Sequence, residues 1–318
     1  MDKRPLGRSG LSTAPLVLGG NVFGWTADEK TSFAILDRFV DAGFNVIDTA
    51  NTYSTWVPGH KGGESETVIG RWLAQGGRRE RVLIATKVGM EKEGEKGLKR
   101  AQVEKHAEQS LKRLGIERID LYQTHKDDPD TPVGETLEAL DRLVKAGKVR
   151  AIGASQYEPA RLAESLEASR SRGIARYDTW QPEYNLYDRA KFERELQPLA
   201  MEHGLAVIPF FGLAKGFLSG KYRSLADIKG RPREGGLKRY FEGGRGLRIL
   251  AALDAVSSRV GATPAQVSLA WSLAQPTIAA PIVSVTSTAQ LDELMGAARL
   301  KLDAAMLGEL DQASREGS

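Results

Sequence analysis

The chain has 318 residues, of which 41% are hydrophobic and 27% are charged, a balance that is typical of a globular protein. Lys and Arg number 45 against 41 Asp and Glu, which gives a net charge of only +4. This small excess does not favour nucleic acid as a partner. The absence of cysteine excludes disulfides, thiolate metal sites and cysteine nucleophiles.

The sequence also gives no sign of a metal centre, a membrane segment or an assembly motif. The four histidines are far apart and have no ligand spacing, so we expect no metal site. The N-terminus has no apolar stretch of signal-peptide length, and no run approaches the ~18 apolar residues of a membrane span. We therefore expect a cytoplasmic protein without a membrane partner. The sequence has no heptad pattern that would indicate assembly. The oligomeric state therefore stays open, with a monomer as the default.

Eight short apolar runs along the chain predict β-strands that are covered on both faces, because the runs lack strict polar–apolar alternation. They are residues 14–19, 45–50, 81–87, 119–125, 149–155, 177–185, 205–211 and 277–285. Between them, polar stretches with helical spacing include 32–42, 103–114 and 136–146, each followed by a glycine that is suited to end a helix. Pro132 stands where a first-turn proline belongs.

Eight strand–helix alternations in one chain predict an α/β fold, a (β/α)8 barrel with residues 1–318 as a single domain. A doubly wound open sheet is disfavoured because no GxGxxG or GxxxxGK[ST] motif is present. Two segments fall outside the repeat. Residues Arg4 to Leu11 predict a short hairpin that plugs the barrel floor. Tyr222 to Gly246 is too long for an ordinary connection; we weigh a lid against a mobile surface insertion and favour the lid.

Four reactive residue types follow adjacent strands of the predicted barrel. Asp48, Lys87 and His125 end the second, third and fourth runs, and Tyr53 follows Asp48 by five positions. Because the carboxyl ends of barrel strands meet on one rim, we expect these four side chains to converge. Each of them alone is more often a capping, solvated or hydrogen-bonded structural residue.

Together these four residues suit proton donation during carbonyl reduction. The Lys87 ammonium would lower the high reference pKa of Tyr53, and Asp48 would keep that ammonium charged. His125 would orient the carbonyl through a hydrogen bond. Since no side chain supplies a hydride, a cofactor must.

The chain resembles the aldo-keto reductases over almost its full length. Six blocks in the family order carry the resemblance: NVIDTANTY (45–53), ATK (85–87), YQTH (122–125), LVKAGKVRAIGAS (143–155), QPEYN (181–185) and IPFFGLAKGFLSGKY (208–222).

The resemblance implies a role for each matching position. Asp48, Tyr53, Lys87 and His125 correspond to the catalytic tetrad. The residues that the resemblance implies for cofactor binding are Ser155, Gln156, Gln181, Phe210, Phe211, Leu213, Gly216, Leu218, Gly220, Lys221, Thr286, Ser287, Gln290 and Glu293. Gln156 replaces the Asn of many members. Phe210 replaces the usual stacking Tyr, and a phenyl face can still stack.

The resemblance implies NADPH or NADP+ as the cofactor, with NADH less favoured. The block at 281–294, which resembles the segment for the adenosine 2′-phosphate, has Thr286 and Ser287 where many members have Lys or Arg. Hydroxyls and a helix N-terminus can still bind phosphate. The small-molecule carbonyl substrate would meet loop residues that could line an apolar pocket: Asn21, Phe23, Trp25, Tyr53, Trp56 and Met90.

Two other functions stay open on the sequence. A family relative that binds NADPH could act as a redox-sensing or regulatory subunit with little turnover. Alternatively, Lys87 at a strand end is compatible with a Schiff-base lyase, although Asp48 beside it would keep the amine protonated.

Overall fold

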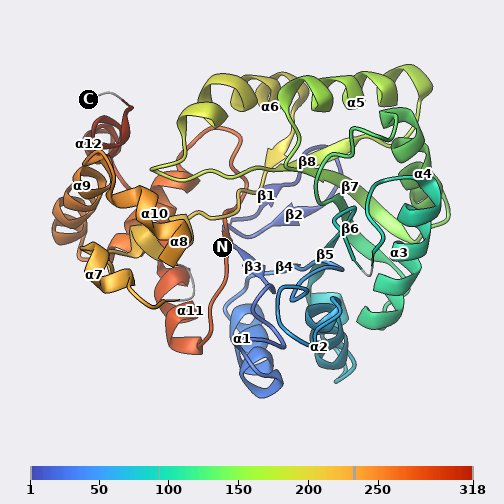
Figure 1. Cartoon of the computed structure of the whole chain (residues 1–318), viewed down its shortest axis with the longest axis horizontal. Coiled ribbons are helices and arrows are strands. Elements are labelled where there is room, and N and C mark those ends of the chain that lie inside the picture. Colours follow the sequence, from blue (N-terminus) through green and yellow to red (C-terminus); the bar gives the residue numbers. More distant parts are fainter. Residues whose placement is uncertain (1, 93, 232–233, 317–318) are drawn as a thin grey trace.

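A computed structural model describes residues 2–92, 94–231 and 234–316. Eight parallel strands form one sheet in the order β10-β3-β4-β5-β6-β7-β8-β9 (Figure 1). Their bounds are β3 (Val17–Gly19), β4 (Val46–Asp48), β5 (Leu83–Val88), β6 (Ile119–Thr124), β7 (Val149–Ser155), β8 (Tyr177–Gln181), β9 (Ala206–Val207) and β10 (Ile282–Val283). A bridge between Val207 and Ile278 and a hydrogen bond from Ile282 N to Pro209 O join the two edges. The predicted (β/α)8 barrel is confirmed, and each predicted run overlaps one strand.

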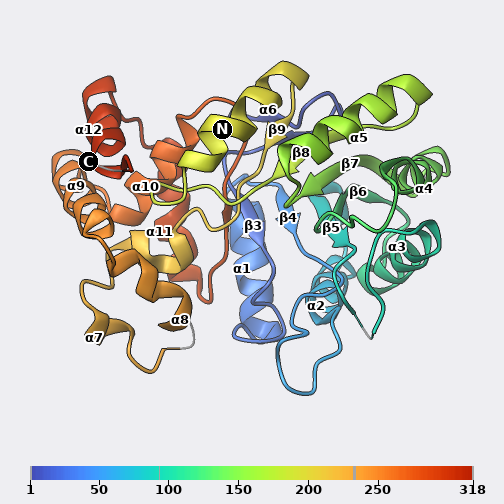
Figure 2. The same ribbon diagram turned by 45° about the horizontal axis from the view of Figure 1, so that its top comes forward.

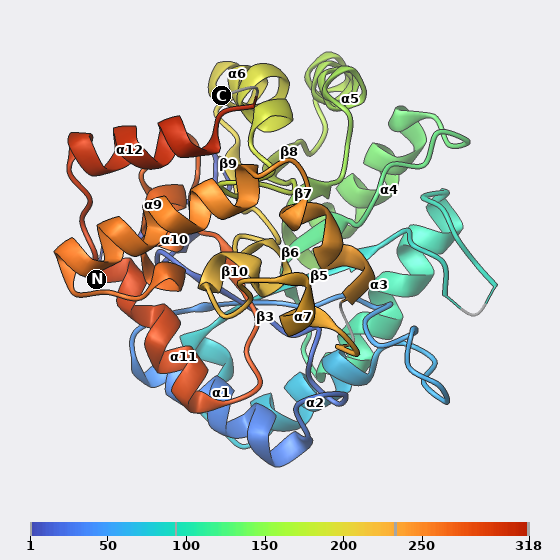
Figure 3. The ribbon, with the colours of Figure 1, turned by 60° about the vertical axis from the view of Figure 1, so that its left-hand side comes forward.

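Helices surround the strands on the outside of the sheet (Figure 1). They are α1 (Glu29–Asp41), α2 (Glu64–Leu73), α3 (Arg100–Leu114), α4 (Val133–Lys145), α5 (Pro159–Arg172), α6 (Gln197–His203), α9 (Arg245–Val260), α10 (Pro264–Leu273), α11 (Thr288–Met295) and α12 (Ala304–Ser314). Short turns of other helix types are η1 (Arg79–Arg81), η2 (Phe192–Leu196), η3 (Ala214–Ser219), η4 (Lys238–Phe241) and η5 (Gly296–Arg299). Figure 3 shows α9 to α12 gathered on one side of the barrel. None of the helices in the described ranges is both long and apolar enough to cross a membrane.

The three helices predicted at 32–42, 103–114 and 136–146 are present as α1, α3 and α4, and each begins three residues before its predicted start. For α1 the reason is Asp28, whose carboxylate accepts a hydrogen bond from Thr31 N at 2.8 Å and so caps the first turn. Gly115 ends α3 in the left-handed conformation, as expected. Pro132 lies at the N-cap of α4 rather than inside its first turn.

A hairpin seals the barrel at the end where the strands begin. Strands β1 (Arg4–Pro5) and β2 (Ser12–Thr13) pair antiparallel, which confirms the predicted hairpin and extends it to Thr13. Its Leu6 and Leu11 are buried in one apolar cluster with inward-facing strand residues, among them Val46 and Leu121. This plug closes the floor to water, so that end of the barrel is a packed core.

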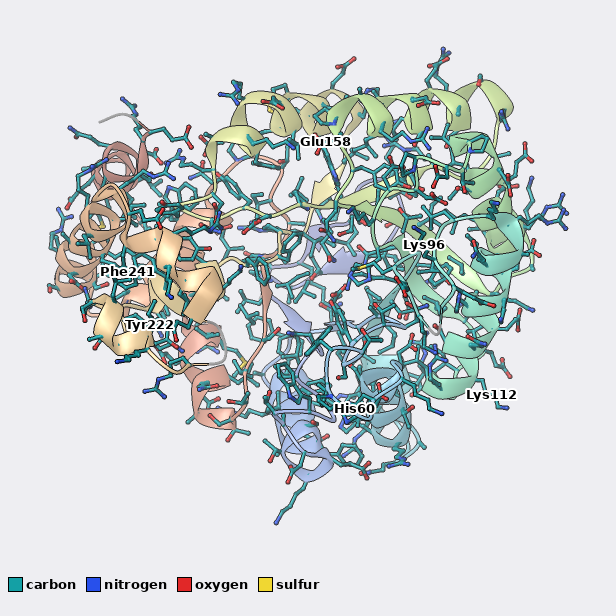
Figure 4. All side chains as sticks on the ribbon, viewed as in Figure 1. His60, Lys96, Lys112, Glu158, Tyr222 and Phe241 are labelled. Atoms are coloured by element: carbon teal, nitrogen blue, oxygen red, sulfur yellow. The ribbon has the colours of Figure 1, made fainter. Side chains whose placement is uncertain are left out.

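The described parts of the long segment 222–246 lie against the barrel wall. It contains the short helices α7 (Leu225–Ile228) and α8 (Glu234–Leu237), which stand on the same side of the molecule as α9 and α10 in Figure 2. Tyr222 and Phe241, near its two ends, are labelled in Figure 4. Its Leu237 and Tyr240 are fully buried, and Arg239 pairs with Asp188 at 2.7 Å. These buried side chains anchor the segment to the barrel, while most of its other described residues are exposed.

We expect the fit of the hairpin under the barrel to be tight at Gly7. A Cβ on Gly7 would lie 2.2 Å from the carbonyl oxygen of Asp178, and its φ of +61° disfavours other residues. Gly7→Ala should therefore lower the free energy of unfolding by about 1–3 kcal/mol more than Gly10→Ala, measured by urea denaturation. Gly10 is the matched control because its φ is also positive, +73°, but no atom lies within 4 Å of the added Cβ. Equal losses in the two variants would contradict this account of the hairpin.

Candidate active site

The carboxyl ends of the strands bring the predicted residues to one rim. Asp48 is the last residue of β4, Ser155 ends β7 and Gln181 ends β8. Lys87 lies one position before the end of β5, and His125 directly follows β6. In a parallel barrel all these ends face the same way, so the expected convergence follows from the topology.

Lys87 is the centre of the cluster. Its side chain is fully buried, and its Nζ donates to Asp48 Oδ2 at 2.5 Å, to Tyr53 OH at 2.8 Å and to Thr49 O at 2.9 Å. An ammonium has three N–H donors, and all three have partners here. Tyr53 OH in turn lies 3.4 Å from Asp48 Oδ2. The structure thus brings together Asp48, Tyr53 and Lys87 as the sequence predicts.

Two buried glutamines hold the other oxygen of Asp48. Gln123 Nε2 donates to Asp48 Oδ1 at 3.0 Å, and Gln181 Nε2 donates to the same atom at 3.1 Å. Gln123 was not predicted from the sequence. The signal was a lone amide inside the apolar run of β6, two positions before His125, where strand alternation turns both side chains toward the same face.

The protonation of the cluster differs from the expectation in one respect. Burial raises the pKa of the Tyr53 hydroxyl to about 12, although the Lys87 ammonium opposes this shift. The predicted net lowering is wrong because desolvation of the phenolate outweighs the attraction of Lys87. Burial lowers the pKa of Lys87, but Asp48 and Tyr53 outweigh burial, so the pKa of Lys87 lies above its usual value. Tyr53 is therefore protonated and Lys87 charged at neutral pH.

His125 lies beside Tyr53, with 5.9 Å between the two ring centroids. Burial, and then the charge of Lys87, hold the pKa of His125 well below its usual value, so the imidazole is neutral at pH 7. Its Nδ1 lies 3.5 Å from Thr52 Oγ1. The carbonyl oxygen of His125 accepts a hydrogen bond from Gln156 Nε2 at 3.1 Å.

A cavity of about 540 Å³ opens over this cluster. Most of the predicted site residues line it: Asn21, Tyr53, Trp56, Met90, His125, Ser155, Gln156, Gln181, Phe210, Phe211, Leu213, Gly216, Lys221, Gln290 and Glu293. Asp48 and Lys87 do not line it, and both contact Tyr53 from behind. The cavity wall therefore presents the phenol, while the charged pair is covered.

Two predicted site residues direct their side chains into the core rather than toward the cavity. Phe23, expected in the substrate pocket, is fully buried in an apolar cluster with Val68 and Ile69 of α2. Leu218, expected at the cofactor, is also fully buried and packs in the main core. Burying an apolar side chain in the core is more favourable than exposing it to a polar cavity. The spacing of apolar residues in the sequence could not predict which way these two side chains point.

Four further predicted residues lie near the cavity but do not line it. Trp25 contacts Trp56, a residue of the cavity wall, with 5.7 Å between the two ring centroids. Gly220 ends η3 in the left-handed conformation. Thr286 N donates to Gln290 Oε1 at 2.9 Å, and Ser287 caps α11 through Gln290 N. Their roles remain predictions.

The loop after β9 has an unusual backbone at the cavity wall. Phe211, Ala214 and Lys215 have positive φ values of 54°, 47° and 57°, a region that is costly for residues other than glycine. Lys215 lines the cavity together with Ser219 and Ser284, and none of the three was predicted from the sequence. No described residue of the segment 222–246 lines the cavity, so a lid role for that segment finds no lining contact.

The chain is similar to known proteins over most of its length. A model of the aldo/keto reductase family matches residues 15–315. YrpG of Bacillus subtilis, named an uncharacterized oxidoreductase, is 36% identical over 98% of this chain and 95% of its own. A probable voltage-gated potassium channel subunit beta of Oryza sativa is 32% identical over 93% of this chain and 91% of its own. The aldo-keto reductase yakc of Schizosaccharomyces pombe, whose name specifies NADP(+), is 29% identical over 97% and 91%.

We expect the buried pair to make stability depend on both partners. Asp48→Asn leaves the Lys87 ammonium buried without its counter-ion and should lower the free energy of unfolding by about 3–5 kcal/mol, measured by urea denaturation. The double variant Asp48→Asn, Lys87→Met buries no charge and should recover most of this loss. As a control, Asp292→Asn breaks an ion pair with Arg38 whose side chains are about half exposed and should cost less than about 1 kcal/mol. A double variant as unstable as Asp48→Asn would contradict this interpretation.

Proposed function

Because the chain belongs to the aldo/keto reductase family, we propose that it is an NADPH-dependent oxidoreductase that reduces an aldehyde or ketone to an alcohol. The observation that carries the proposal is a tyrosine hydroxyl at the wall of a cavity, hydrogen-bonded from behind by a buried ammonium (Tyr53 and Lys87). This arrangement suits the delivery of a proton to an oxygen that becomes negatively charged.

The residues along the cavity fit a nicotinamide dinucleotide. The Phe210 ring at the wall can stack on a flat heterocycle, and the side chains of Ser155 and Gln181 border the same cavity. Lys215 and Lys221 bring two cations to it for a pyrophosphate. When bound, the reduced nicotinamide supplies the hydride that no side chain can provide.

The proton would come from Tyr53. As the carbonyl oxygen gains charge, the phenol gives up its proton to that oxygen. The Lys87 ammonium at 2.8 Å then stabilises the phenolate that remains. Asp48 keeps the ammonium charged and fixed in direction through the contact at 2.5 Å. Neutral His125 at the cavity wall can donate one N–H to the same substrate oxygen.

The substrate end of the cavity is formed by large side chains. Trp56 and Met90 line it and are 50% and 40% exposed, which makes them available for apolar contact with a substrate. Trp25 packs edge-on against Trp56 and would hold that ring in place. We propose a small-molecule carbonyl with an apolar or aromatic remainder as the substrate.

We propose NADPH rather than NADH, on the family resemblance and on polar groups beside Gln290 and Glu293. Thr286 and Ser287 stand at this end, where a 2′-phosphate would meet hydroxyls and backbone N–H groups instead of a cation. These contacts would hold the phosphate less strongly than a lysine or arginine side chain would.

A second candidate is a cofactor-binding regulatory subunit with slow turnover, which the similarity to a probable channel subunit beta favours. The Schiff-base lyase is disfavoured. Lys87 has all three ammonium protons bound to partners and does not line the cavity, so it has neither a lone pair nor access to a substrate.

The nucleotide assignment can be tested by fluorescence titration of the purified protein with NADPH and with NADH. We expect tighter binding of NADPH, by at least about tenfold, because one or two charge-assisted hydrogen bonds to the 2′-phosphate are added. Ser287→Ala should reduce this preference and leave NADH affinity unchanged. Asp303→Ala, which removes the N-cap of α12, controls for loss of a helix cap. Equal affinity for the two dinucleotides would show that this end does not select the phosphate, and binding of neither would refute the reductase.

The proton donor can be tested with Tyr53→Phe. We expect kcat for NADPH-dependent reduction of an aromatic aldehyde to fall by about 10²–10⁴-fold, with the Kd for NADPH nearly unchanged, because only the transferred proton is lost. Tyr157→Phe is the control, since Tyr157 is also buried but contacts Tyr177 and does not line the cavity. Turnover within tenfold of the wild type in Tyr53→Phe would refute the role of this residue. An unmodified protein that binds NADPH but turns over at the rate of Tyr53→Phe would favour the regulatory subunit.

A further inference from the structure

Asp48, Gln123 and Gln181 form one layer inside the top of the barrel. They belong to β4, β6 and β8, which are alternate strands of the sheet, and alternate strands supply the side chains of one layer in such barrels. Asp48 pairs with Ala85 of β5, and Lys87, two residues further along β5, pairs with Gln123. In the same way, Gln123 pairs with Gly153 of β7, and Ser155, two residues further along β7, pairs with Gln181. Because the strands tilt against the barrel axis, these shifts place the three side chains at the same height along that axis.

The three side chains are connected by hydrogen bonds and almost completely buried. Asp48, Gln123 and Gln181 are 1%, 0% and 3% exposed. Besides its bond to Asp48, Gln181 Nε2 donates to Gln123 Oε1 at 3.3 Å. Gly153 leaves room for this arrangement, since a Cβ there would lie 3.2 Å from Gln123 Cγ and 2.2 Å from Thr179 Oγ1.

The charge of Asp48 decides which way both amides point. If either amide were turned over, its oxygen would face the Asp48 carboxylate, and two acceptors would repel each other. Both glutamines must therefore offer N–H to Asp48 Oδ1. Gln123 is then left with Oε1 directed at Gln181, where it accepts the second N–H of that amide.

As a consequence, the side-chain oxygen of Gln181 is available to a ligand. Both of its N–H groups have partners, to Asp48 and to Gln123. Within the described part of the chain, no hydrogen bond engages its Oε1, and Gln181 lines the cavity. Gln181 can thus accept a hydrogen bond from a bound ligand but has no donor left to offer.

We propose that Gln123 is a positioning residue that fixes the Gln181 amide, so that Gln181 presents an acceptor oxygen to the carboxamide N–H of the nicotinamide. This inference rests on the proposed function. Without Gln123, the Gln181 amide keeps a single contact, to Asp48, and can rotate about it. The second N–H of Gln181 then competes with its oxygen for the ligand. The same network ties the group that holds the cofactor to the carboxylate that holds Lys87.

The test compares two ligands that differ only at the group in question. NADP+ carries the carboxamide, and its 3-acetylpyridine analogue keeps the carbonyl but has a methyl in place of the NH2. Each is titrated against the full-length protein, with tryptophan fluorescence as the readout. In the unmodified protein we expect NADP+ to bind roughly five- to tenfold more tightly, the contribution of about one hydrogen bond.

Gln123→Met keeps the length of the side chain and removes both polar atoms. We expect it to reduce the preference for NADP+ over the analogue to roughly twofold or less. The loss should fall on NADP+, with the affinity for the analogue unchanged. Gln123→Asn, which keeps an amide that is one carbon too short, should act in the same direction and serves if Gln123→Met does not fold. Thermal unfolding of each variant checks the fold.

Thr124→Val is the matched control. Thr124 is the next residue of β6, is also fully buried, and its Oγ1 donates to Tyr177 OH at 3.5 Å outside this layer. The control should keep the full preference for NADP+. Equal weakening of both ligands in Gln123→Met, or an unchanged preference, would overturn the role of Gln123. If the unmodified protein binds NADP+ but does not discriminate against the analogue, the positioning role fails while the reductase proposal stands. Binding of neither dinucleotide would overturn both.

Discussion

The burial of one ammonium group constrains most of this site. Moving a lysine charge out of water costs several kcal/mol, and a nearby anion must offset that cost. Here Asp48 does so at 2.5 Å, with Thr49 O and Tyr53 OH as the remaining acceptors. Asp48 is itself buried, so its second oxygen also needs donors, and the two glutamines supply them. A chain of obligatory partners therefore runs from β5 through β4 to β6 and β8.

This requirement explains why the phenol rather than the amine faces the cavity. Lys87 has no donor left and no contact with the cavity, whereas Tyr53 stands between Lys87 and the cavity. The tyrosine keeps its proton because the cost of burying a phenolate exceeds the attraction of the ammonium. Such a proton is transferred when a neighbouring oxygen becomes a stronger base, as a carbonyl oxygen does during its reduction.

The two ends of the barrel are built for different tasks. At the floor, the hairpin buries Leu6 and Leu11 against the starts of the strands, and the close approach of Gly7 to Asp178 leaves no space. At the rim, the loop after β9 holds Phe211, Ala214 and Lys215 in a costly backbone conformation. Strain is tolerated where the packed floor and walls supply the stability.

The order of apolar runs and polar strand ends is enough to predict the barrel and the members of the reactive cluster. Eight apolar runs with helical stretches between them admit few folds, and parallel strands bring Asp48, Lys87 and His125 to one rim whatever their exact register. Which neighbouring side chains turn inward, and what charge they carry, depends on the folded chain. The side chains of Phe23 and Leu218 pack in the core, although both residues belong to segments on the cavity side of the barrel. Gln123 lies within β6, and only the stagger of β4, β6 and β8 places its amide beside Asp48. The direction of the pKa shift of Tyr53 could not be predicted from the sequence either, because desolvation depends on every atom that excludes water from the hydroxyl. Sequence order fixes which groups are near a strand end, whereas register, loop conformation and burial are collective properties of the folded chain.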